Sequence, residues 1–246
     1  MSAKIELQPS YILHTRPYRD TSLLIDALSA DYGKVSLVAK GARKAKNNQR
    51  YLLQPLNPLL LSWQGHHALK TLIGVESSQD KYELSGPHLY SVLYANELLS
   101  YLLAGDDPAI DIFQNYEYLL RSLSNQTTSI EPALREFEFS LLDSLGYGIN
   151  FAQDAEDGQS IKPNTAYYFV QDQGFVRVEC RPDIRGASFL GSDLLAIEQR
   201  NFIEVSTRQA AKQLARFALT PHLRGRPLKS RELFRPLVKG NSSLPE

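Results

Sequence analysis

The residues with the clearest chemical signature lie in one short run. The segment "LVAKGARKAKNNQR", residues 37–50, holds five cations and no acid. Neither Asp nor Glu occurs between Asp31 and Glu76. Such a stretch either builds a positive potential toward a polyanion or forms a solvated loop whose lysines aid solubility. Charge alone favours neither interpretation. The cations of the stretch are Lys34, Lys40, Arg43, Lys44, Lys46, Arg50 and Lys70.

The net charge of zero over 246 residues hides a division along the chain. Residues 1–80 carry 10 Lys/Arg and 6 Asp/Glu, residues 81–204 carry 8 and 19, and residues 205–246 carry 9 and 2. The two ends are therefore basic and the middle is acidic. A basic end can meet an external polyanion, or it can pair with the acidic middle of its own chain.

Composition excludes several classes of protein. A single cysteine, Cys180, rules out a disulfide framework and a cysteine-based zinc site within the chain, and it fits a reducing compartment. No apolar run reaches membrane-spanning length, and the start "MSAKIELQPS" lacks the apolar core of a signal peptide. We expect a cytoplasmic protein with no membrane segment.

Catalytic patterns are missing from the sequence. The five histidines show no H-E-x-x-H spacing, and no phosphate-binding G-x-x-x-x-G-K-[ST] loop occurs. The string "DAEDG" at 154–158 resembles a calcium loop only superficially and is interpreted as a surface turn. A nuclease would need clustered carboxylates beside the basic run, and the separation of Asp20, Asp26 and Asp31 gives no evident metal pair. We expect no enzyme, no cofactor and no metal.

The N-terminal third has the pattern of a small antiparallel barrel. Five short runs rich in Leu or β-branched residues lie between residues 9 and 78, with a tight turn at Asp31–Gly33. The basic run would then connect the third strand to the fourth, and Pro55 and Pro58 suit an edge strand there. An OB-type barrel with a cationic loop is a common single-strand binder. Candidate stacking residues, each of which could instead be a packed aromatic, are Tyr18, Tyr51 and Trp63.

Beyond Pro87 the hydrophobic period changes from 2 to 3.6. Three amphipathic helices are predicted within 89–103, 112–123 and 134–145, and "LGYG" supplies a glycine stop for the third. Residues 150–185 are expected to be a linker and a hairpin that turns near Gly174.

A last helix is predicted in "STRQAAKQLARFALT". Ser206 and Gln209 have the spacing of a capping box for it. On this helix Arg208, Lys212 and Arg216 recur every four residues, so they share one face.

Four segments together carry a family resemblance: "RDTSLLIDALSADYGKVSLVAKGARK" (19–44), "LYSVLYANELLSYLL" (89–103), "PALREFEFSLLDSLGYG" (132–148) and "ALTPHLRGRPLKSRELF" (218–234). In this order they closely resemble the bacterial RecO family over nearly the whole chain. The resemblance implies an α+β fold, with an OB-type β-barrel at residues 1–80 and a mainly α-helical domain at 81–246. Many relatives carry a four-cysteine zinc element after "LGYG", where this chain has Cys180 alone. It therefore resembles the zinc-free branch, with a small β-hairpin insertion at 150–185.

The resemblance also implies a function in DNA repair and recombination. A protein of this family is a mediator that binds single- and double-stranded DNA without sequence specificity and anneals complementary strands. With RecR it helps RecA onto strands coated by single-stranded DNA-binding protein (SSB). The alternative from another class is a non-enzymatic adaptor whose basic loop faces an acidic protein.

Three groups of residues are the predicted sites. For DNA contact we predict Lys34, Lys40, Arg43, Lys44, Lys46 and Arg50, which would neutralise phosphates. A second basic region, which has interdomain pairing with the acidic middle as its alternative role, comprises Arg208, Lys212, Arg216, Arg224, Arg226, Lys229 and Arg231. For the acidic C-terminal tail of SSB, which the family binds, we predict Arg135 and, more weakly, Arg121. The alternative for Arg135 is an ion pair with Glu131 or Glu138 at helical spacing.

Overall fold

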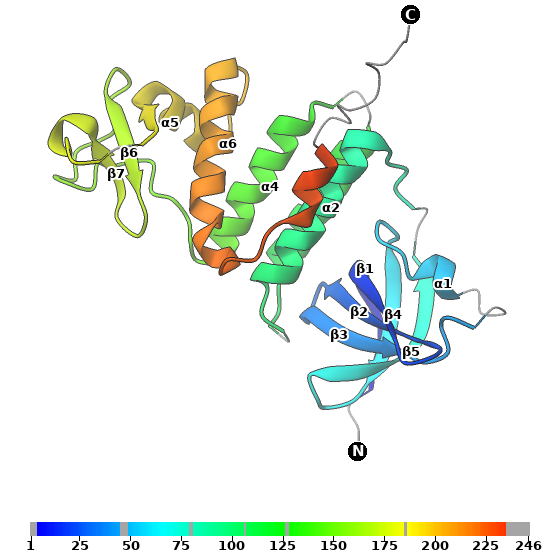
Figure 1. Cartoon of the computed structure of the whole chain (residues 1–246). Helices are drawn as coiled ribbons and strands as arrows, with labels where there is room; N and C mark the ends of the chain where they lie inside the picture. Colours follow the sequence, from blue (N-terminus) through cyan, green and yellow to red (C-terminus); the bar gives the residue numbers. More distant parts are fainter. Residues whose placement is uncertain are drawn as a thin grey trace, which may run out of the picture. The chain divides into compact units, whose positions relative to one another are not determined.

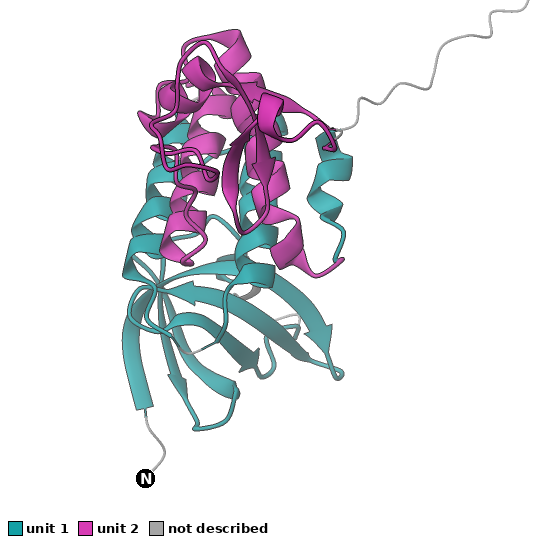
Figure 2. Ribbon diagram, turned by 90° about the vertical axis from the view of Figure 1, so that its left-hand side faces the viewer, with its two compact units in different colours: residues 1–127, 226–246 teal, residues 128–225 magenta. Residues whose placement is uncertain are grey.

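The chain forms two compact units in a computed structural model, which describes residues 4–44, 49–78, 81–105, 107–125, 128–184 and 186–234. The first unit comprises residues 1–127 and 226–246, and the second comprises residues 128–225 (Figure 2). The C-terminal segment therefore belongs to the same unit as the N-terminal barrel.

Five strands of the first unit close into a barrel in the order β1-β2-β3-β5-β4 (Figure 1). Their bounds are Lys4–Tyr18 (β1), Ser22–Ser29 (β2), Gly33–Ala39 (β3), Leu59–Gln64 (β4) and Leu69–Ser77 (β5), and the short helix α1, Gln49–Leu52, precedes β4. The predicted OB-type barrel is thereby confirmed.

Two details of the barrel differ from the sequence prediction. The pairing is not antiparallel throughout, because β3 and β5 run parallel, with Ser36 opposite Leu69. The expected edge strand after Pro55 and Pro58 is also wrong, because β4 pairs with both β1 and β5. Closure of the barrel is the physical reason, since a closed sheet has no edge strand.

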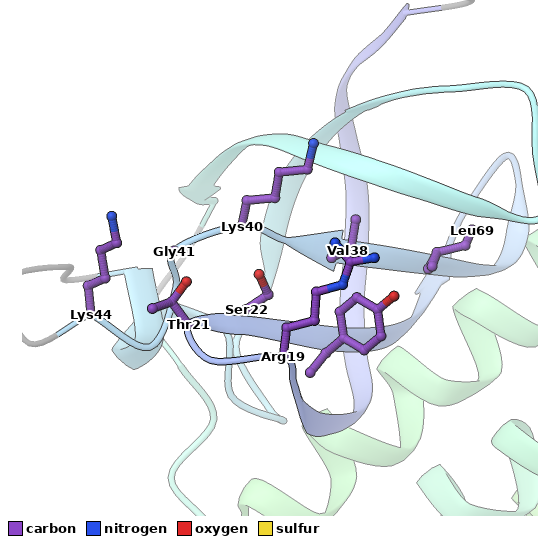
Figure 3. A pocket seen from close by; sticks show the side chains of 9 residues that line it. Arg19, Thr21, Ser22, Val38, Lys40, Gly41, Lys44 and Leu69 are labelled. Atoms are coloured by element: carbon purple, nitrogen blue, oxygen red, sulfur yellow. The ribbon is translucent and has the colours of Figure 1, made fainter.

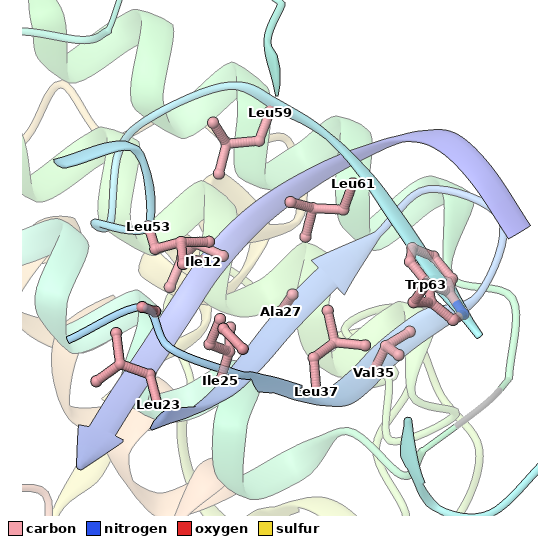
Figure 4. Packing of buried hydrophobic residues seen from close by; sticks show 12 residues of the cluster. Ile12, Leu23, Ile25, Ala27, Val35, Leu37, Leu53, Leu59, Leu61 and Trp63 are labelled. Carbon is pink, nitrogen blue, oxygen red and sulfur yellow. The ribbon is translucent and has the colours of Figure 1, made fainter. Parts of the chain in front are cut away.

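The barrel core consists of buried residues of β1 to β4 together with Ala42 and Leu53 (Figure 4). Leu72 and Val75 of β5 are partly buried and pack against this core. On β3 burial alternates strictly, so Val35 and Leu37 face inward while Ser36 and Val38 face outward. Trp63 is only 1% exposed and packs edge-on against Tyr32, with ring centroids 5.4 Å apart. Of the two roles that the sequence left open, Trp63 is the packed aromatic, because its ring is part of the core.

Helices α2, Gly86–Leu102, and α3, Ile110–Ser124, complete the first unit together with the C-terminal segment. Tyr11 of β1 attaches α3 to the barrel. Its ring centroid lies 5.3 Å from those of Phe113 and Tyr116, and its hydroxyl donates to Glu117 Oε1 at 3.2 Å. The aromatic cluster is buried, so β1 has apolar contacts on both of its faces.

The second unit combines helices with a small sheet. Its elements are α4 (Ile130–Ser144), β6 (Ala166–Val170), β7 (Gly174–Arg177), the 3-10 helix η1 (Val178–Cys180), β8 (Ser188–Leu190), α5 (Gly191–Glu198), α6 (Val205–Leu219) and the 3-10 helix η2 (Pro221–Leu223). The predicted hairpin is confirmed as β6 and β7, and β8 extends it to a three-stranded sheet in the order β7-β6-β8.

Of the two predicted helix ends, the stop after α4 is confirmed and the start of α6 is not. Gly146 takes a φ of +79° just after α4, which confirms the glycine stop. The capping box of Ser206 and Gln209 is wrong, because α6 begins at Val205 with Glu204 as its N-cap, which places Ser206 inside the first turn. The hydroxyls of Ser206 and Thr207 instead donate to Asp193 Oδ1, at 3.0 and 2.8 Å. The Ser206 hydroxyl, which would have capped the helix in a capping box, thus donates to a carboxylate of α5.

Arg177 ties the linker before β6 to the sheet. Its Nε lies 2.9 Å from Asp154 Oδ2 and its Nη2 lies 2.6 Å from Asp157 Oδ2. Both aspartates belong to the "DAEDG" string, so a guanidinium occupies the carboxylates that resemble a calcium loop. Ion pairing and packing thus fasten this segment.

The C-terminal segment is fastened to α2 by one carboxylate. The backbone N–H groups of Lys229 and Ser230, at the start of the 3-10 helix η3, Lys229–Phe234, donate to Glu97 at 2.9 Å each. The Ser230 hydroxyl adds a 2.6 Å bond and the Tyr101 hydroxyl a 3.2 Å bond. Burial acts to raise the pKa of Glu97, but these hydrogen bonds outweigh burial and leave the pKa below its ordinary value.

Glu97→Gln should loosen this attachment, since the amide group cannot accept all four bonds. We expect a loss of about 1.5–3 kcal/mol of unfolding free energy near pH 7, measured by denaturant titration. Because the folded pKa lies below the unfolded value of about 4.3, the stabilisation is fully present above the unfolded value and is lost as pH falls through the folded value. The difference between wild type and Glu97→Gln should therefore shrink in acid. Glu6→Gln, which removes an exposed carboxylate paired with Lys4, is the matched control and should cost at most about 1 kcal/mol. A pH-independent difference would contradict this account of Glu97.

Candidate nucleic-acid interface

A cationic pocket of about 530 Å³ lies where the β1–β2 turn, the end of β3 and the start of β5 meet (Figure 3). We call it the corner pocket. In OB folds the face of strands 2 and 3 and the β1–β2 and β4–β5 loops bind oligonucleotides, and the β1–β2 turn is part of this pocket. No acid is among the described residues that line the pocket. They are Tyr18, Arg19, Thr21, Ser22, Val38, Lys40, Gly41, Lys44 and Leu69.

Lys40 and Lys44 enter the corner pocket from the basic run. Both side chains are exposed, and a turn between them is closed by the Lys44 N–H donating to the Gly41 carbonyl at 3.1 Å. Gly41 has a φ of +70°, a conformation that other residues adopt only with strain. The glycine thus lets the chain turn so that two lysines of the predicted set line one pocket.

Arg19 is a pocket residue that the sequence analysis missed. It sits in the β1–β2 turn with a φ of +49°, which costs a non-glycine residue about 1–2 kcal/mol. Its guanidinium carbon lies 5.2 Å from the centroid of the Tyr18 ring. A sequence signal existed, because Arg19 lies in the polar turn between two strand-like runs. The acid-free stretch that indicated the predicted cations begins only after Asp31, so it does not include Arg19.

Arg43, also predicted to contact DNA, is not among the residues that line the corner pocket. Its backbone N–H donates to the Thr21 carbonyl at 2.8 Å, and its Nη1 donates to the Arg19 carbonyl at 3.2 Å. Arg43 thereby joins the basic run to the β1–β2 turn. In this structure it positions Arg19, while its exposed guanidinium still adds positive charge nearby.

The remaining predicted cations of the barrel are placed differently. The Lys34 ammonium donates to the Ser100 carbonyl in the last turn of α2 at 2.9 Å, and burial lowers the pKa of Lys34. Lys34 therefore lies apart from the corner pocket. Lys46 and the side chain of Arg50 lie outside the described residues. Of the other aromatic candidates, Tyr18 lines the pocket and Tyr51 is 75% exposed on α1.

The second basic region divides between the two units. On α6 of the second unit, Lys212 Nζ and Arg208 Nε lie 3.5 and 3.9 Å from the Glu131 carboxylate. Arg208 also donates to the carbonyls of Phe202 and Ile203. These two cations thus pair within the acidic middle of the sequence. Arg216 and Arg224 are exposed in the same unit.

Three cations of the C-terminal segment belong to the first unit. The Arg226 guanidinium lies 5.4 Å from the Tyr101 ring centroid, and Arg231 lies 5.9 Å from that of Tyr94. Lys229 is exposed at the start of η3. These residues lie along α2.

The two arginines predicted for the SSB tail differ in accessibility. The Arg135 side chain is 9% exposed, and its Nη1 lies 2.8 Å from Glu138 Oε2, in a carboxylate side chain that is 1% exposed. This contact is the ion pair with Glu138 that the sequence offered as the alternative role of Arg135. The pair is buried in the fold. Arg121 is 71% exposed and lies 3.9 Å from Glu117.

Within the described part of the chain, neither a metal-binding cluster nor a membrane-spanning helix is present. No group of three or more His, Cys, Asp or Glu residues there is placed to hold a metal ion, and Cys180 is exposed. No helix within the described ranges is long and apolar enough to cross a bilayer.

A closed five-stranded barrel places the chain among the OB-fold proteins. The family model "Recombination protein O N terminal" matches residues 1–79, and "Recombination protein O C terminal" matches residues 85–232. The chain belongs to the RecO family of DNA repair proteins.

Relatives from several bacteria are similar to this chain over almost its whole length. DNA repair protein RecO of Cellvibrio japonicus is 46% identical over 235 residues, which cover 95% of this chain and 98% of the relative. The Vibrio cholerae protein of that name is 43% identical over 229 residues, 93% of each chain. The Actinobacillus pleuropneumoniae protein is 42% identical over 228 residues, 93% of this chain and 94% of the relative.

Arg135→Ala should destabilise the protein, because it removes a guanidinium 2.8 Å from a buried carboxylate. We expect a loss of about 3–5 kcal/mol in denaturant unfolding. Replacing both partners, as in Arg135→Met with Glu138→Leu, should recover much of that loss. Arg181→Ala, which breaks the more exposed pair with Asp183, is the control and should change the unfolding free energy far less. An Arg135→Ala variant as stable as wild type would show that this ion pair does not stabilise the second unit.

Proposed function

We propose that this protein is a recombination mediator that binds single- and double-stranded DNA without sequence specificity and anneals complementary strands. With RecR it would help RecA load onto strands coated by SSB, in the cytoplasm. The observation that carries the proposal is the corner pocket, where Arg19, Lys40 and Lys44 gather on the barrel face that OB folds use for oligonucleotides.

The chemistry of the corner pocket supports binding without sequence preference. Lysine and arginine side chains contact phosphates, which carry no sequence information. The Tyr18 ring can stack on any base, since every base has a π face. Binding of this kind tolerates every sequence, as strand annealing and RecA loading both require.

Annealing follows from the same charges. Two complementary strands repel each other through their phosphates, and a protein that neutralises part of this charge lowers the cost of bringing them together. Arg19, Lys40 and Lys44 would supply that neutralisation on the barrel. The proposal needs no catalytic group, and we propose that the protein is not an enzyme.

DNA binding should weaken steeply as salt rises. For single-stranded DNA, each neutralised phosphate adds about −0.7 to the slope of log affinity against log salt. The double variant Lys40→Gln with Lys44→Gln should therefore flatten the slope by about 1.4. Measured by fluorescence anisotropy, the effect should be the same for oligonucleotides of different sequence.

Lys4→Gln with Lys162→Gln is the matched control, because it removes the same charge from two exposed lysines that lie outside the corner pocket. An unchanged slope in the Lys40/Lys44 variant would place the DNA site elsewhere. Absence of binding in the wild type would favour the adaptor instead. Running the titration with and without Mg²⁺ also tests catalysis, since strand breakage with the metal would show a nuclease.

The SSB tail is the partner that we propose for Arg135 and Arg121. The family docks on a short acidic segment that ends in an apolar residue, and a guanidinium suits such carboxylates. Arg135 Nε is buried and has no hydrogen-bond partner among the described residues, so this side chain retains a donor. A tail reaching Arg135 would compete with Glu138.

A labelled tail peptide tests this proposal. Peptide affinity should fall in Arg135→Ala and fall less in Arg121→Ala. It should rise in Glu138→Gln, because a competing carboxylate is gone. Thermal melting must show that each variant is folded before its affinity is interpreted. Wild-type peptide affinity in folded Arg135→Ala would exclude Arg135, and unchanged DNA affinity in that variant would separate the two sites.

A further inference from the structure

A second and larger pocket of the first unit has no role in the function described above. It measures about 750 Å³ and lies between the outer face of β1 and β2, helix α2 and the C-terminal segment. We call it the side pocket. The cations Arg16, Arg226 and Lys229 line it, together with Asn96 and Ser100 of α2.

Two polar groups of the side pocket lack partners among the described residues. Asn96 is only 3% exposed, and its Oδ1 accepts a 2.6 Å bond from the Tyr116 hydroxyl. The other polar atom of this amide, Nδ2, is buried and has no hydrogen-bond partner. The Ser100 hydroxyl, one turn further along α2, is also buried without a hydrogen-bond partner. Buried polar groups are nearly always hydrogen-bonded to protein or to ordered water, so these two groups beside one pocket are available to a water molecule or to a ligand.

The side pocket shares a barrel face with the corner pocket. Arg16 lines the side pocket and Tyr18, two residues along β1, lines the corner pocket, so both point to the outside of the barrel. Arg16 pairs with Leu24 on β2, and Leu24 pairs with Val38 on β3, a residue of the corner pocket. This cross-strand row spans roughly 10 Å, the width of two strand spacings.

Three carboxylates line the side pocket beside its cations. Asp26 accepts a 2.8 Å bond from the Ser36 hydroxyl, and Glu97 is occupied by the C-terminal segment. Glu232 is the third acid that lines the pocket. Against these stand Arg16, Arg226 and Lys229, whose ammonium and guanidinium groups suit phosphate.

We propose that the side pocket holds a nucleotide of the same single strand that occupies the corner pocket. The strand would follow the row Arg16–Leu24–Val38 across the barrel, Arg226 and Lys229 would contact its phosphates, and Asn96 and Ser100 would hydrogen-bond a base. Every base offers oxygen or nitrogen acceptors, so one amide donor imposes no strict sequence. This inference rests on the proposed function and extends its footprint to α2 and to the C-terminal segment.

Continuity with the corner pocket favours a nucleic acid over an acidic peptide as the occupant. A peptide would use Arg226 and Lys229 equally well, yet it would have no reason to continue into the corner pocket. The two ligands therefore differ in a measurable way. If a single strand spans both pockets, binding of a long strand depends on both, whereas binding of a short strand depends on the corner pocket alone.

Oligonucleotide length tests the inference. OB folds bind between about 4 and about 16 nucleotides, so labelled oligo-dT of these two lengths is the probe. Arg226→Gln and Ser100→Ala should each weaken binding of the long probe by about twofold to tenfold and leave the short probe unchanged. Arg226→Gln should also flatten the salt slope of the long probe by about 0.7.

Two further variants complete the design. Arg181→Gln carries the same charge change outside both pockets and should leave both probes unchanged. Asn96→Asp keeps an oxygen that can accept from Tyr116 but removes the amide donor and adds a negative charge. It should weaken the long probe more than Ser100→Ala does, with melting curves to confirm that it folds.

The outcomes separate this inference from the proposed function. If Lys40→Gln with Lys44→Gln weakens the long probe while Arg226→Gln and Ser100→Ala do not, the inference fails and the proposed function stands. If the wild type binds neither probe, both fail. A labelled peptide rich in Asp and Phe is the last arm. Loss of peptide binding in Arg226→Gln with unchanged binding of the long probe would make the side pocket a peptide site and overturn the inference.

Discussion

Closure of five strands around one core is the constraint on which the first unit depends. Once Val35, Leu37 and Trp63 fill the interior, strand alternation forces Arg16, Tyr18 and Val38 to the outside. The turns that complete the circuit then deliver Arg19, Lys40 and Lys44 to one corner. The cationic surface is thus a consequence of packing the core, because the alternation that buries the aliphatic residues also sets where the polar ones point.

Most of the barrel and the helices could be predicted from the sequence because hydrophobic period and glycine turns are local signals. Strand runs within residues 9–78 and the glycine stop at Gly146 were of this kind. The predictions failed where a distant group decides the outcome. Ser206 had a suitable partner in Gln209, yet Asp193 of α5 takes its hydroxyl. For Trp63 the sequence left stacking and packing both open, because strand register decides whether an aromatic faces in or out.

The candidate site shows the same limit. Lys40 and Lys44 were predictable because an acid-free run is visible in one dimension. Lys34 belongs to the same run, but the end of α2 offers its ammonium a carbonyl. The charged groups of this chain find partners that lie close in the fold, although some of these partners are distant in the sequence. Arg208 and Lys212 pair with Glu131, Arg177 pairs with Asp154 and Asp157, and Glu97 binds backbone N–H groups. Counting charges along the sequence could show that partners were needed, and only the fold could assign them.

The return of the C-terminal segment to the first unit has a consequence for synthesis in the cell. The second unit interrupts the first, so 98 residues, from 128 to 225, must be made before η3 can reach Glu97. At ribosomal rates of about 5–20 residues per second, the delay is roughly 5 to 20 seconds. During that interval the nascent barrel and α2 lack the C-terminal segment, and Glu97 lacks the N–H groups of Lys229 and Ser230 that bind it. The first unit is therefore completed only after the C-terminal segment has been made, and a ribosome that stops early releases this unit unfinished.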